Sequence, residues 1–424
     1  MWSVRRSLAV AATVCGLLAA AAPGLAAISP AQSLVRALKR NLRLAGSANG
    51  AYVVDLSTGQ PLFSARSTTP RLPASVEKLY TTSTALLRYG PTATLTTSVL
   101  GSGSEDSAGV WHGTLYLKGG GDPTFGWAAF DRANYGGLGA TVERLVADLI
   151  HATGITAVQG RIDADASYFD THLGTPATGY AASSEVEGEL DGVAFDRGWS
   201  NFSGSAFQAR PTLFAAQQFA RALRSAHVKV PRGTPISAGR APVAGARTLT
   251  YVFSPPIATL IQLTNTPSDN YFAETLLKDL GARFGGAGST AAGVSVVQSE
   301  LADQFGIDPR LNDGSGLSYN DSTSPQQVVA LLQHMASNAY FTKSLAIAGR
   351  TGTLEFVDQR TRAQGRCIGK TGTLAAVANV AGYCQARDGH TLAFAFLVNG
   401  NTATDYVHNV LEGRMMVALA RYDG

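Results

Sequence analysis

The sequence predicts an α/β protein in which a sheet flanked by helices is built from both ends of the chain, with a large, mainly β module inserted between its two parts. Alternating apolar and polar residues, typical of strands, occur before residue 66 and again after residue 366, with helical patterns ahead of the second group. From about residue 92 to residue 260 the pattern changes to short apolar strands separated by Gly, Pro and Ser. We therefore predict one discontinuous domain, residues 27–91 with 261–424, and one or two inserted accessory domains, residues 92–260.

The first part of the discontinuous domain begins with a helix and a pair of strands. Leucines at positions 34, 38 and 42 share one helical face and predict a helix over residues 31–44. The alternating run 52–56, the turn Ser57-Thr58-Gly59 and the run 61–65 predict two paired strands. A second helix is predicted over residues 74–89, where Gly90-Pro91 stops it.

The inserted module and the last third of the chain carry the remaining predicted elements. In the module, strands are predicted at 114–117, 158–162 and 248–253, and helices at 141–152 and 211–224. After it, helices are predicted at 268–280, 291–305 and 324–336, strands at 367–374, 377–384 and 392–398, and a closing helix at 405–420. The first two of these strands form a predicted hairpin whose turn lies near Ala375 and Ala376.

The first 26 residues predict a secretory signal peptide. Residues 1–6 carry two arginines, residues 8–22 are almost entirely apolar, and Gly24-Leu25-Ala26 offers small residues before a cleavage point. An uncleaved anchor is the alternative, but the apolar run is shorter than the roughly 20 residues that span a bilayer. We therefore expect an exported protein, in the periplasm or the extracellular cell wall, without a stable membrane span.

Composition narrows the possible functions. A net charge of +4 is too small to indicate nucleic-acid binding, so we expect no nucleic-acid partner. The seven histidines are scattered without the spacing of a zinc site, and we expect no metal and no cofactor. Cys15 would be removed with the signal peptide, which leaves Cys367 and Cys384 in an oxidising setting. These two cysteines flank the predicted hairpin and form either a cross-strand disulfide or two buried free thiols.

Three short motifs occur in order along the chain. They are Ser75-Val76-Glu77-Lys78, Ser268-Asp269-Asn270 and Lys370-Thr371-Gly372-Thr373. The chain has only seven lysines against 27 arginines, and two of the seven lysines lie in these motifs. An arginine cannot lose its proton in a protein, whereas a lysine can. Of these two residue types, one that acts as a base must therefore be a lysine, even in a chain that otherwise uses arginine. Lysine usage therefore supports a chemical role for Lys78 and Lys370.

The motifs together predict acyl transfer. Ser75 lies in the first turn of its helix, where the helix N-terminus favours negative charge, and Lys78 shares its face three residues later. Ser75 would attack a carbonyl with neutral Lys78 as the proton acceptor. On helical geometry Glu77 points away from that face, so we expect it to be solvated.

The second and third motifs would serve the substrate. Ser268 would relay a proton to the leaving nitrogen, and the Asn270 amide would hold the substrate backbone. Lys370 would help to keep Lys78 neutral and attract a substrate carboxylate, to which Thr371 and Thr373 offer hydroxyls.

On these motifs the chain resembles the D-alanyl-D-alanine carboxypeptidase/endopeptidase family of low-molecular-mass class C penicillin-binding proteins, the S13 serine peptidases. Three further segments agree with the family pattern: 119–124, 313–318 and 349–354. The resemblance implies a serine β-lactamase/transpeptidase-like domain with an antiparallel sheet, peptidoglycan stem peptides as substrates and β-lactam antibiotics as covalent inhibitors. It also implies an oxyanion hole from the backbone N–H groups of Ser75 and Thr373, and places Asp122 and Arg350 near the pocket for the stem-peptide side chain.

Two other classes remain open on the sequence. A serine β-lactamase or esterase shares the acylation apparatus, but the only glutamates between the second and third motifs are Glu274, Glu300 and Glu355, and none is followed four residues later by asparagine. A catalytically silent envelope binding protein would have lost Ser75, Lys78 or Lys370, and none is lost.

Overall fold

A computed structural model describes residues 1–2 and 28–424 of the chain, so the predicted signal peptide lies almost entirely outside the described residues. The α-helices are α1 Pro30–Leu44, α2 Lys78–Tyr89, α3 Ala128–Tyr135, α4 Val142–Thr153, α5 Pro211–Ser225, α6 Ile257–Asn265, α7 Asn270–Phe284, α8 Thr290–Phe305, α9 Pro325–Met335, α10 Ala339–Ser344, α11 Thr404–Tyr406 and α12 Gly413–Ala420. The strands are β1 Asn49–Asp55, β2 Pro61–Ala65, β3 Thr96–Glu105, β4 Val110–Lys118, β5 Ala157–Asp165, β6 Ile236–Ala238, β7 Arg247–Phe253, β8 Ala346–Ile347, β9 Cys367–Leu374, β10 Val377–Gln385 and β11 Thr391–Asn399. Short 3-10 turns lie at η1 Ala74–Glu77, η2 Pro176–Thr178, η3 Asp196–Gly198 and η4 Gly352–Leu354, and a π-helical turn, η5 Val407–Glu412, joins α11 to α12.

The sheet predicted from both ends of the chain is present. Its strand order is β2-β1-β11-β10-β9-β8, and every neighbouring pair is antiparallel. Strand β1 joins the C-terminal strands by pairing with β11, from Asn49 opposite Val398 to Asp55 opposite Leu392. The N-terminal segment therefore completes a sheet whose other strands lie about 300 residues later.

A second sheet forms entirely within the predicted insertion. Its order is β6-β5-β4-β3-β7; β5 is parallel to both β4 and β6, whereas β3 is antiparallel to both β4 and β7. Helices α4 and α5 pack with this sheet around a core of their own that includes Trp111, Leu145 and Phe219. All strands of the five-stranded sheet lie within residues 92–260, and all strands of the six-stranded sheet lie outside that range. The division into domains stays a prediction.

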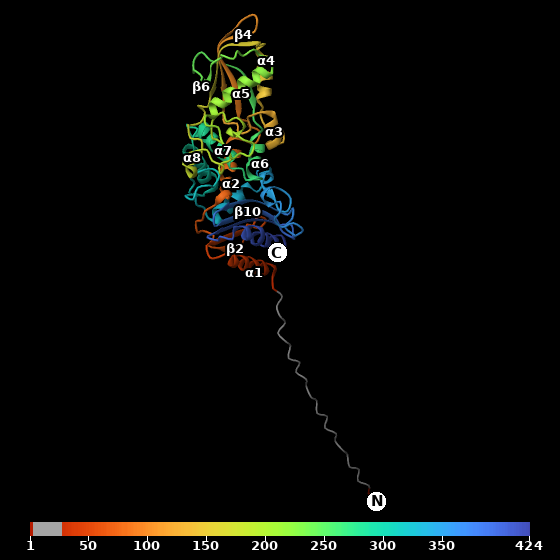
Figure 1. Cartoon of the computed structure of the whole chain (residues 1–424). Coiled ribbons are helices and arrows are strands. Elements are labelled where there is room, and N and C mark those ends of the chain that lie inside the picture. Colours follow the sequence, from red (N-terminus) through yellow and green to blue (C-terminus); the bar gives the residue numbers. More distant parts are fainter. Residues whose placement is uncertain (3–27) are drawn as a thin grey trace.

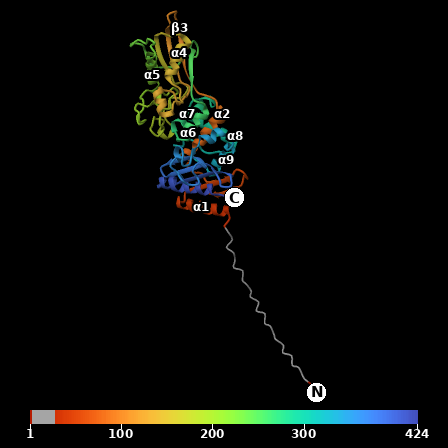
Figure 2. The ribbon, with the colours of Figure 1, turned by 90° about the vertical axis from the view of Figure 1, so that its right-hand side faces the viewer.

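The two sheets lie at opposite ends of an elongated molecule, with a layer of helices between them. In Figure 1 the five-stranded sheet with α4 and α5 is at the top, α2, α6, α7 and α8 are in the middle, and the six-stranded sheet with α1 is at the bottom. Figure 2 shows the same division after rotation by 90°, with the C-terminus beside α1. Among the described residues, no helix combines the length and the apolar character that crossing a bilayer requires.

The six-stranded sheet is covered on both faces, because side chains along a strand alternate between faces. Ala381 and Tyr383 of β10 belong to the core that contains α2, α7, α8 and α9. Val380 and Cys384 of the same strand belong to the core that contains α1 and α12. The sheet thus has a helical layer on either side.

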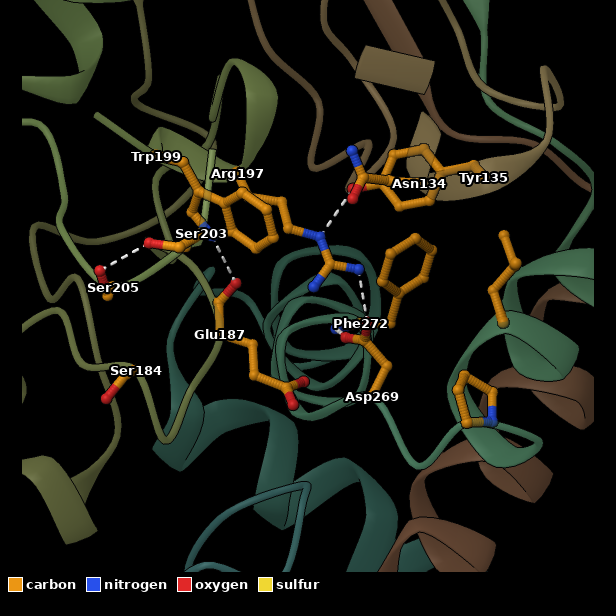
Figure 3. Close-up of a pocket in the computed structure, with 13 residues that line it drawn as sticks. Asn134, Tyr135, Ser184, Glu187, Arg197, Trp199, Ser203, Ser205, Asp269 and Phe272 are labelled. Carbon is orange, nitrogen blue, oxygen red and sulfur yellow. Dashed lines mark hydrogen bonds and ion pairs between the residues drawn. The ribbon is translucent and has the colours of Figure 1, made fainter. Parts of the chain in front are cut away.

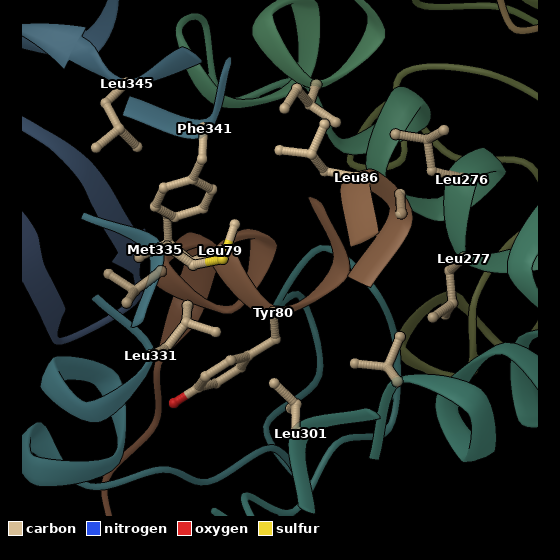
Figure 4. Close-up of a cluster of buried hydrophobic side chains, with 14 of the residues drawn as sticks. Leu79, Tyr80, Leu86, Leu276, Leu277, Leu301, Leu331, Met335, Phe341 and Leu345 are labelled. Carbon is tan, nitrogen blue, oxygen red and sulfur yellow. The ribbon is translucent and has the colours of Figure 1, made fainter. Parts of the chain in front are cut away.

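Helix α2 lies at the centre of the larger core. All residues from Lys78 to Leu86 are buried. Figure 4 shows Leu79, Tyr80 and Leu86 among side chains of the surrounding helices. The helix therefore has no solvent-facing side along its first nine residues.

Most predicted elements agree with the structure to within a few residues, and the misses have physical reasons. Strand β3 and helices α3, α6 and α10 were not predicted. Strand β3 contains Gly101, Gly103 and three serines, which hide a strand pattern, although Trp111 fills the space beside Gly101. The closing helix was predicted as one continuous segment, but it contains the π-helical turn η5.

The two remaining cysteines form a disulfide. Cys367 of β9 and Cys384 of β10 are directly opposite each other in the register, and their sulfur atoms are bonded. The hairpin turns at Leu374 to Val377, with Ala376 at a φ of 59°. The bridge therefore joins the ends of the hairpin that carries the third motif.

A chain that begins at residue 28 should contain no free thiol. We expect denatured protein to show no mass increase on alkylation without reductant and two adducts after reduction, because Cys367 and Cys384 are bonded to each other. Intact-mass spectrometry measures both states. Two adducts without reductant would contradict the bridge.

Candidate active site

The first motif lies at a strained turn that opens the central helix. Ser75 belongs to η1, and α2 begins at Lys78. The residue before it, Ala74, has a φ of 46°, a conformation that alanine adopts at a cost. A Cβ at Gly316 would lie 2.0 Å from the Ala74 carbonyl oxygen, so only glycine allows this loop to approach the turn. The turn that holds Ser75 is therefore packed closely against a loop about 240 residues later in the sequence.

Lys78 connects the first motif to the second. Its Nζ donates to Ser75 Oγ at 2.8 Å, to Asn270 Oδ1 at 2.5 Å and to the Ser315 carbonyl at 2.9 Å. The side chain is fully buried, and burial lowers the pKa of Lys78 to about 8 although nearby carboxylates raise it. A substantial neutral fraction is therefore present near neutral pH, as a general base requires.

The second motif occupies the start of α7. Ser268 has a φ of 70°, and its Oγ accepts from Lys370 Nζ at 2.7 Å. Asp269 is the N-cap of α7 and accepts from the Phe272 N–H at 2.9 Å. Asn270 begins the helix, so its side chain and that of Ser268 face Lys78 and Lys370 respectively.

Lys370 is also buried completely. Its Nζ donates to Ser268 Oγ and to the Thr371 carbonyl at 2.8 Å. Burial and the nearby Lys78 ammonium hold the pKa of Lys370 well below its usual range. Thr371 Oγ1 donates to Thr353 Oγ1 at 2.8 Å, which ties the third motif to η4.

The strand that carries Lys370 has an open edge. Strand β8 pairs only with Ile368 and Gly369, so no strand within residues 28–424 covers the outer side of β9 from Lys370 to Leu374. A Cβ at Gly372 would lie 2.6 Å from the Pro73 carbonyl oxygen and 3.1 Å from Ser75 N. The absence of a side chain at this glycine thus allows β9 to lie against the turn that holds Ser75.

A cavity of about 480 Å³ lies beside the second motif. Its lining residues are Asn134, Tyr135, Ser184, Glu187, Arg197, Trp199, Ser203, Gly204, Ser205, Leu263, Pro267, Asp269 and Phe272. Figure 3 shows the Arg197 guanidinium between Tyr135 and Asp269, with Glu187 on the neighbouring segment. Most of the lining comes from the predicted insertion, which therefore reaches the site.

Asp122 and Arg350 are the two residues predicted near the pocket for the stem-peptide side chain, and that placement stays a prediction. Asp122 is buried, its Oδ1 accepts from the N–H and Oγ1 of Thr124, and burial raises its pKa to about 7. Arg350 is exposed and packs beside Gly365. Neither lines the cavity next to the second motif. Sequence reasoning missed Ser315, Glu187 and Arg197; only Ser315 lay in a segment that the family resemblance had marked.

The expectation that Glu77 is solvated was wrong. Glu77 is fully buried, because α2 has no exposed face along its first nine residues. Its carboxyl oxygens lie within 4.8 Å of those of Asp313 and Asp321. Burial, together with these two acids, raises the pKa of Glu77 well above its usual range.

These three acids are the only group in residues 28–424 whose oxygens could jointly hold a metal ion. Burial and the neighbouring Asp313 raise the pKa of Asp321 to about 8. A carboxyl group with a pKa raised in this way tends to keep its proton. A carboxyl that keeps its proton can donate to a neighbouring carboxylate. Retained protons would therefore reduce the negative charge that these three acids bring together.

Comparison with known proteins identifies the family. The sequence model of the D-Ala-D-Ala carboxypeptidase 3 (S13) family matches residues 31–184 and 199–421. The chain belongs to the S13 family. It is accordingly a hydrolase of the D-Ala-D-Ala carboxypeptidase kind, as the sequence resemblance predicted.

Relatives and solved structures agree with the S13 assignment. A D-alanyl-D-alanine carboxypeptidase of Actinomadura sp. (strain R39) is 29% identical, covering 92% of this chain and 84% of that protein. A carboxypeptidase of Mycobacterium tuberculosis is also 29% identical, over 90% of this chain and 81% of its own. The crystal structure of penicillin-binding protein 4 from Haemophilus influenzae shares the fold with a TM-score of 0.74 at 20% identity, covering 90% of this chain and 98% of that chain.

Glu77→Gln should stabilise the S13 protein increasingly as pH rises. An acid whose pKa is raised on folding contributes stability below its unfolded pKa, near 4.5 for Glu77, and loses it as pH increases toward the folded value. Glutamine mimics the protonated acid without this loss. Thermal unfolding midpoints at pH 5 and pH 8 should therefore differ between variant and wild type more at pH 8, in favour of the variant. An equal difference at both pH values would contradict a protonated Glu77.

Proposed function

We propose that this protein is an exported serine-type DD-peptidase that hydrolyses the D-Ala-D-Ala termini of peptidoglycan stem peptides, and also their cross-links, through a Ser75 acyl-enzyme. The observation that carries the proposal is the 2.8 Å contact between Lys78 Nζ and Ser75 Oγ inside a buried network that also contains Asn270. Membership of the S13 family supports the substrate class. The proposed cross-link activity is supported by the shared fold with an endopeptidase of Bdellovibrio bacteriovorus, at a TM-score of 0.52 and 15% identity, over 84% of this chain and 87% of that one.

Acylation begins at the first motif. Neutral Lys78 accepts the proton of Ser75 as Oγ attacks the carbonyl of the penultimate D-alanine. The developing oxyanion would receive the backbone N–H groups of Ser75 and Thr373. Ser75 lies in the first turn of η1, and a backbone N–H in a first turn has no acceptor within its own helix. The Ser75 N–H would therefore be free to donate to the oxyanion.

The leaving D-alanine departs on the side of the second and third motifs. Ser268 carries a proton toward the leaving nitrogen, and the terminal carboxylate would meet Lys370, Thr371 and Thr373. A carboxylate beside Lys370 favours the charged amine, which opposes the effect of burial on its pKa. Binding of the substrate carboxylate would thus favour the positively charged form of Lys370, which burial disfavours. Water then attacks the ester carbonyl, which releases the shortened peptide and returns the proton to Ser75 Oγ.

The open edge of β9 supplies a place for the peptide. Backbone groups from Lys370 to Leu374 face no strand on that side. An extended peptide can add to such an edge through main-chain hydrogen bonds. Asn270 would contribute one amide hydrogen, because its other side-chain N–H donates to the Glu185 carbonyl at 2.6 Å.

The same apparatus would react with β-lactams, since they present an amide carbonyl to the serine. Penicillin-binding protein 4 of Haemophilus influenzae has been solved in complex with a β-lactam. Export, to the periplasm or the extracellular cell wall, is proposed from the N-terminal sequence, and the disulfide between Cys367 and Cys384 suits an oxidising compartment.

Ser75→Ala should abolish both hydrolysis and penicillin labelling. We expect release of D-alanine from a pentapeptide ending in D-Ala-D-Ala, and of monomers from cross-linked muropeptides, to fall at least about a thousandfold, because the attacking oxygen is removed. Labelled penicillin should form a stable adduct with the wild type only. As a matched control, Ser295→Ala removes an exposed hydroxyl on α8 and should change neither assay.

Two outcomes would overturn this proposal. Labelling retained in Ser75→Ala would exclude Ser75 as the nucleophile. A wild-type enzyme that releases neither D-alanine nor monomers, or that turns over nitrocefin rapidly, would exclude the peptidase.

The rate of acylation should rise with pH and level off above about 8. The base must be neutral, and the pKa of Lys78 is lowered to about 8, so each unit below that value removes most of the remaining neutral amine. At pH 6 the second-order rate constant for labelled penicillin should be about a hundredfold below its plateau. A rate that is flat from pH 6 to 9 would contradict Lys78 as the base.

A further inference from the structure

One segment at the site lies outside the family match. The S13 sequence model matches residues up to 184 and again from 199, so residues 185–198 lie outside the matched ranges. Glu187 and Arg197, within that segment, line the cavity beside the second motif. This part of the insertion contacts the start of α7, which carries the second motif.

The first contact of this segment is with Asn270. The Asn270 N–H donates to Glu187 Oε2 at 2.9 Å, and Asn270 Nδ2 donates to the Glu185 carbonyl at 2.6 Å. The N–H in the first turn of α7 has no carbonyl within the helix to bond, and Glu187 supplies that acceptor. Trp199 Nε1 donates to the Glu187 carbonyl at 2.9 Å and fixes the segment in turn. Both the backbone and the amide of Asn270 are thus held by this segment.

The second contact is with Asp269. The Arg197 guanidinium forms an ion pair with Asp269, and its Nε donates to Tyr135 Oη at 2.7 Å. The guanidinium also lies within 5.6 Å of the ring centroids of four aromatic side chains. These rings belong to Tyr135, Trp199, Tyr271 and Phe272. Arg197 is buried, so this pair is held in a fixed place rather than in solvent.

We propose that Glu187 and Arg197 are positioning residues for the acyl transfer, holding Asp269 and Asn270 so that the Asn270 side-chain oxygen meets the amine of Lys78. This inference rests on the proposed function. The two contacts act on adjacent residues of one helix start, from one segment. Because Asn270 Oδ1 accepts from Lys78 at 2.5 Å, any movement of the helix start moves an acceptor of the base.

The charges of this segment also act on the base. Glu187 and Asp269 raise the pKa of Lys78, against the larger lowering effect of burial. Glu274 and Asp313 also face Lys78 and raise its pKa. Lys370 faces Lys78 as well, and the charge of Lys78 lowers the pKa of Lys370. Glu187 itself faces Asp269, Arg197 and Lys78. The segment therefore has a readout that a purely structural contact would lack, which is the pH at which the base becomes neutral.

Two substitutions at Glu187 separate its charge from its hydrogen bond. Glu187→Gln keeps an acceptor for the Asn270 N–H but removes the negative charge, so the acidic limb of the acylation profile should move on the order of one unit lower in pH with its plateau kept. At pH 7 this raises the rate of penicillin labelling about fivefold. Glu187→Ala removes both, so the limb should move and the plateau should also fall between about ten- and a hundredfold.

A matched control is available on another helix start. The exposed Glu143 accepts from the N–H of Ala128, the first residue of α3, at 3.1 Å. Glu143→Gln makes the same chemical change far from Lys78 in sequence and should leave the limb and the plateau unchanged.

Arg197→Gln provides a shift of opposite sign. It leaves the Asp269 carboxylate without its cation near Lys78, so the limb should move to higher pH. If this variant does not fold, as judged by thermal unfolding, the two Glu187 variants decide alone. A limb that stays in place in Glu187→Gln, or a plateau that Glu187→Ala leaves unchanged, would overturn the inference. Failure of the proposed function is distinguishable, because it is read from the wild type and Ser75→Ala alone: no release of D-alanine or monomers, rapid nitrocefin turnover, or labelling of Ser75→Ala.

Discussion

The site depends on the three hydrogen bonds of one buried amine. Lys78 Nζ donates to Ser75 in its own helix turn, to Asn270 at the start of α7 and to the Ser315 carbonyl in a later loop. These partners lie up to 237 positions away in the sequence. Since a buried amine without partners is costly, all three segments must be in place at once. The central position of α2, covered on every side, is what makes this amine buried.

Burial is the largest influence on the protonation of the surrounding groups. Desolvation lowers the pKa of both Lys78 and Lys370, and it raises the pKa of Glu77 and Glu274. Both kinds of group are pushed toward their neutral forms, because a low-dielectric interior disfavours charge of either sign. Burial is the largest cause of the lowered pKa of Lys78, so the proposed base beside Ser75 can become neutral through desolvation. The same burial leaves acids near the site, such as Glu77 and Glu274, that must keep their protons.

The sequence predicted the parts of the site that depend on local geometry and residue chemistry. Ser75 and Lys78 are three residues apart in one turn, and Cys367 faces Cys384 across one hairpin, so short-range spacing was sufficient. The burial of Glu77 was not predicted, because helical periodicity gives the direction of a side chain but not the residues that it meets. Here those residues are two other acids, Asp313 and Asp321. The contacts of residues 187 and 197 were not predictable, since they join irregular backbone to α7 over 83 and 72 positions.

The short length of β8 has a consequence for stereochemistry. Two residues of β8 leave the outer side of β9 unpaired from Lys370 onward. Pairing along such an edge uses N–H and C=O groups that every residue carries, whatever the hand of its α-carbon. A pocket shaped around L side chains would reject the mirror-image residues. If a peptide adds to the edge of β9, its main-chain pairing alone would not distinguish the two hands of an alanine.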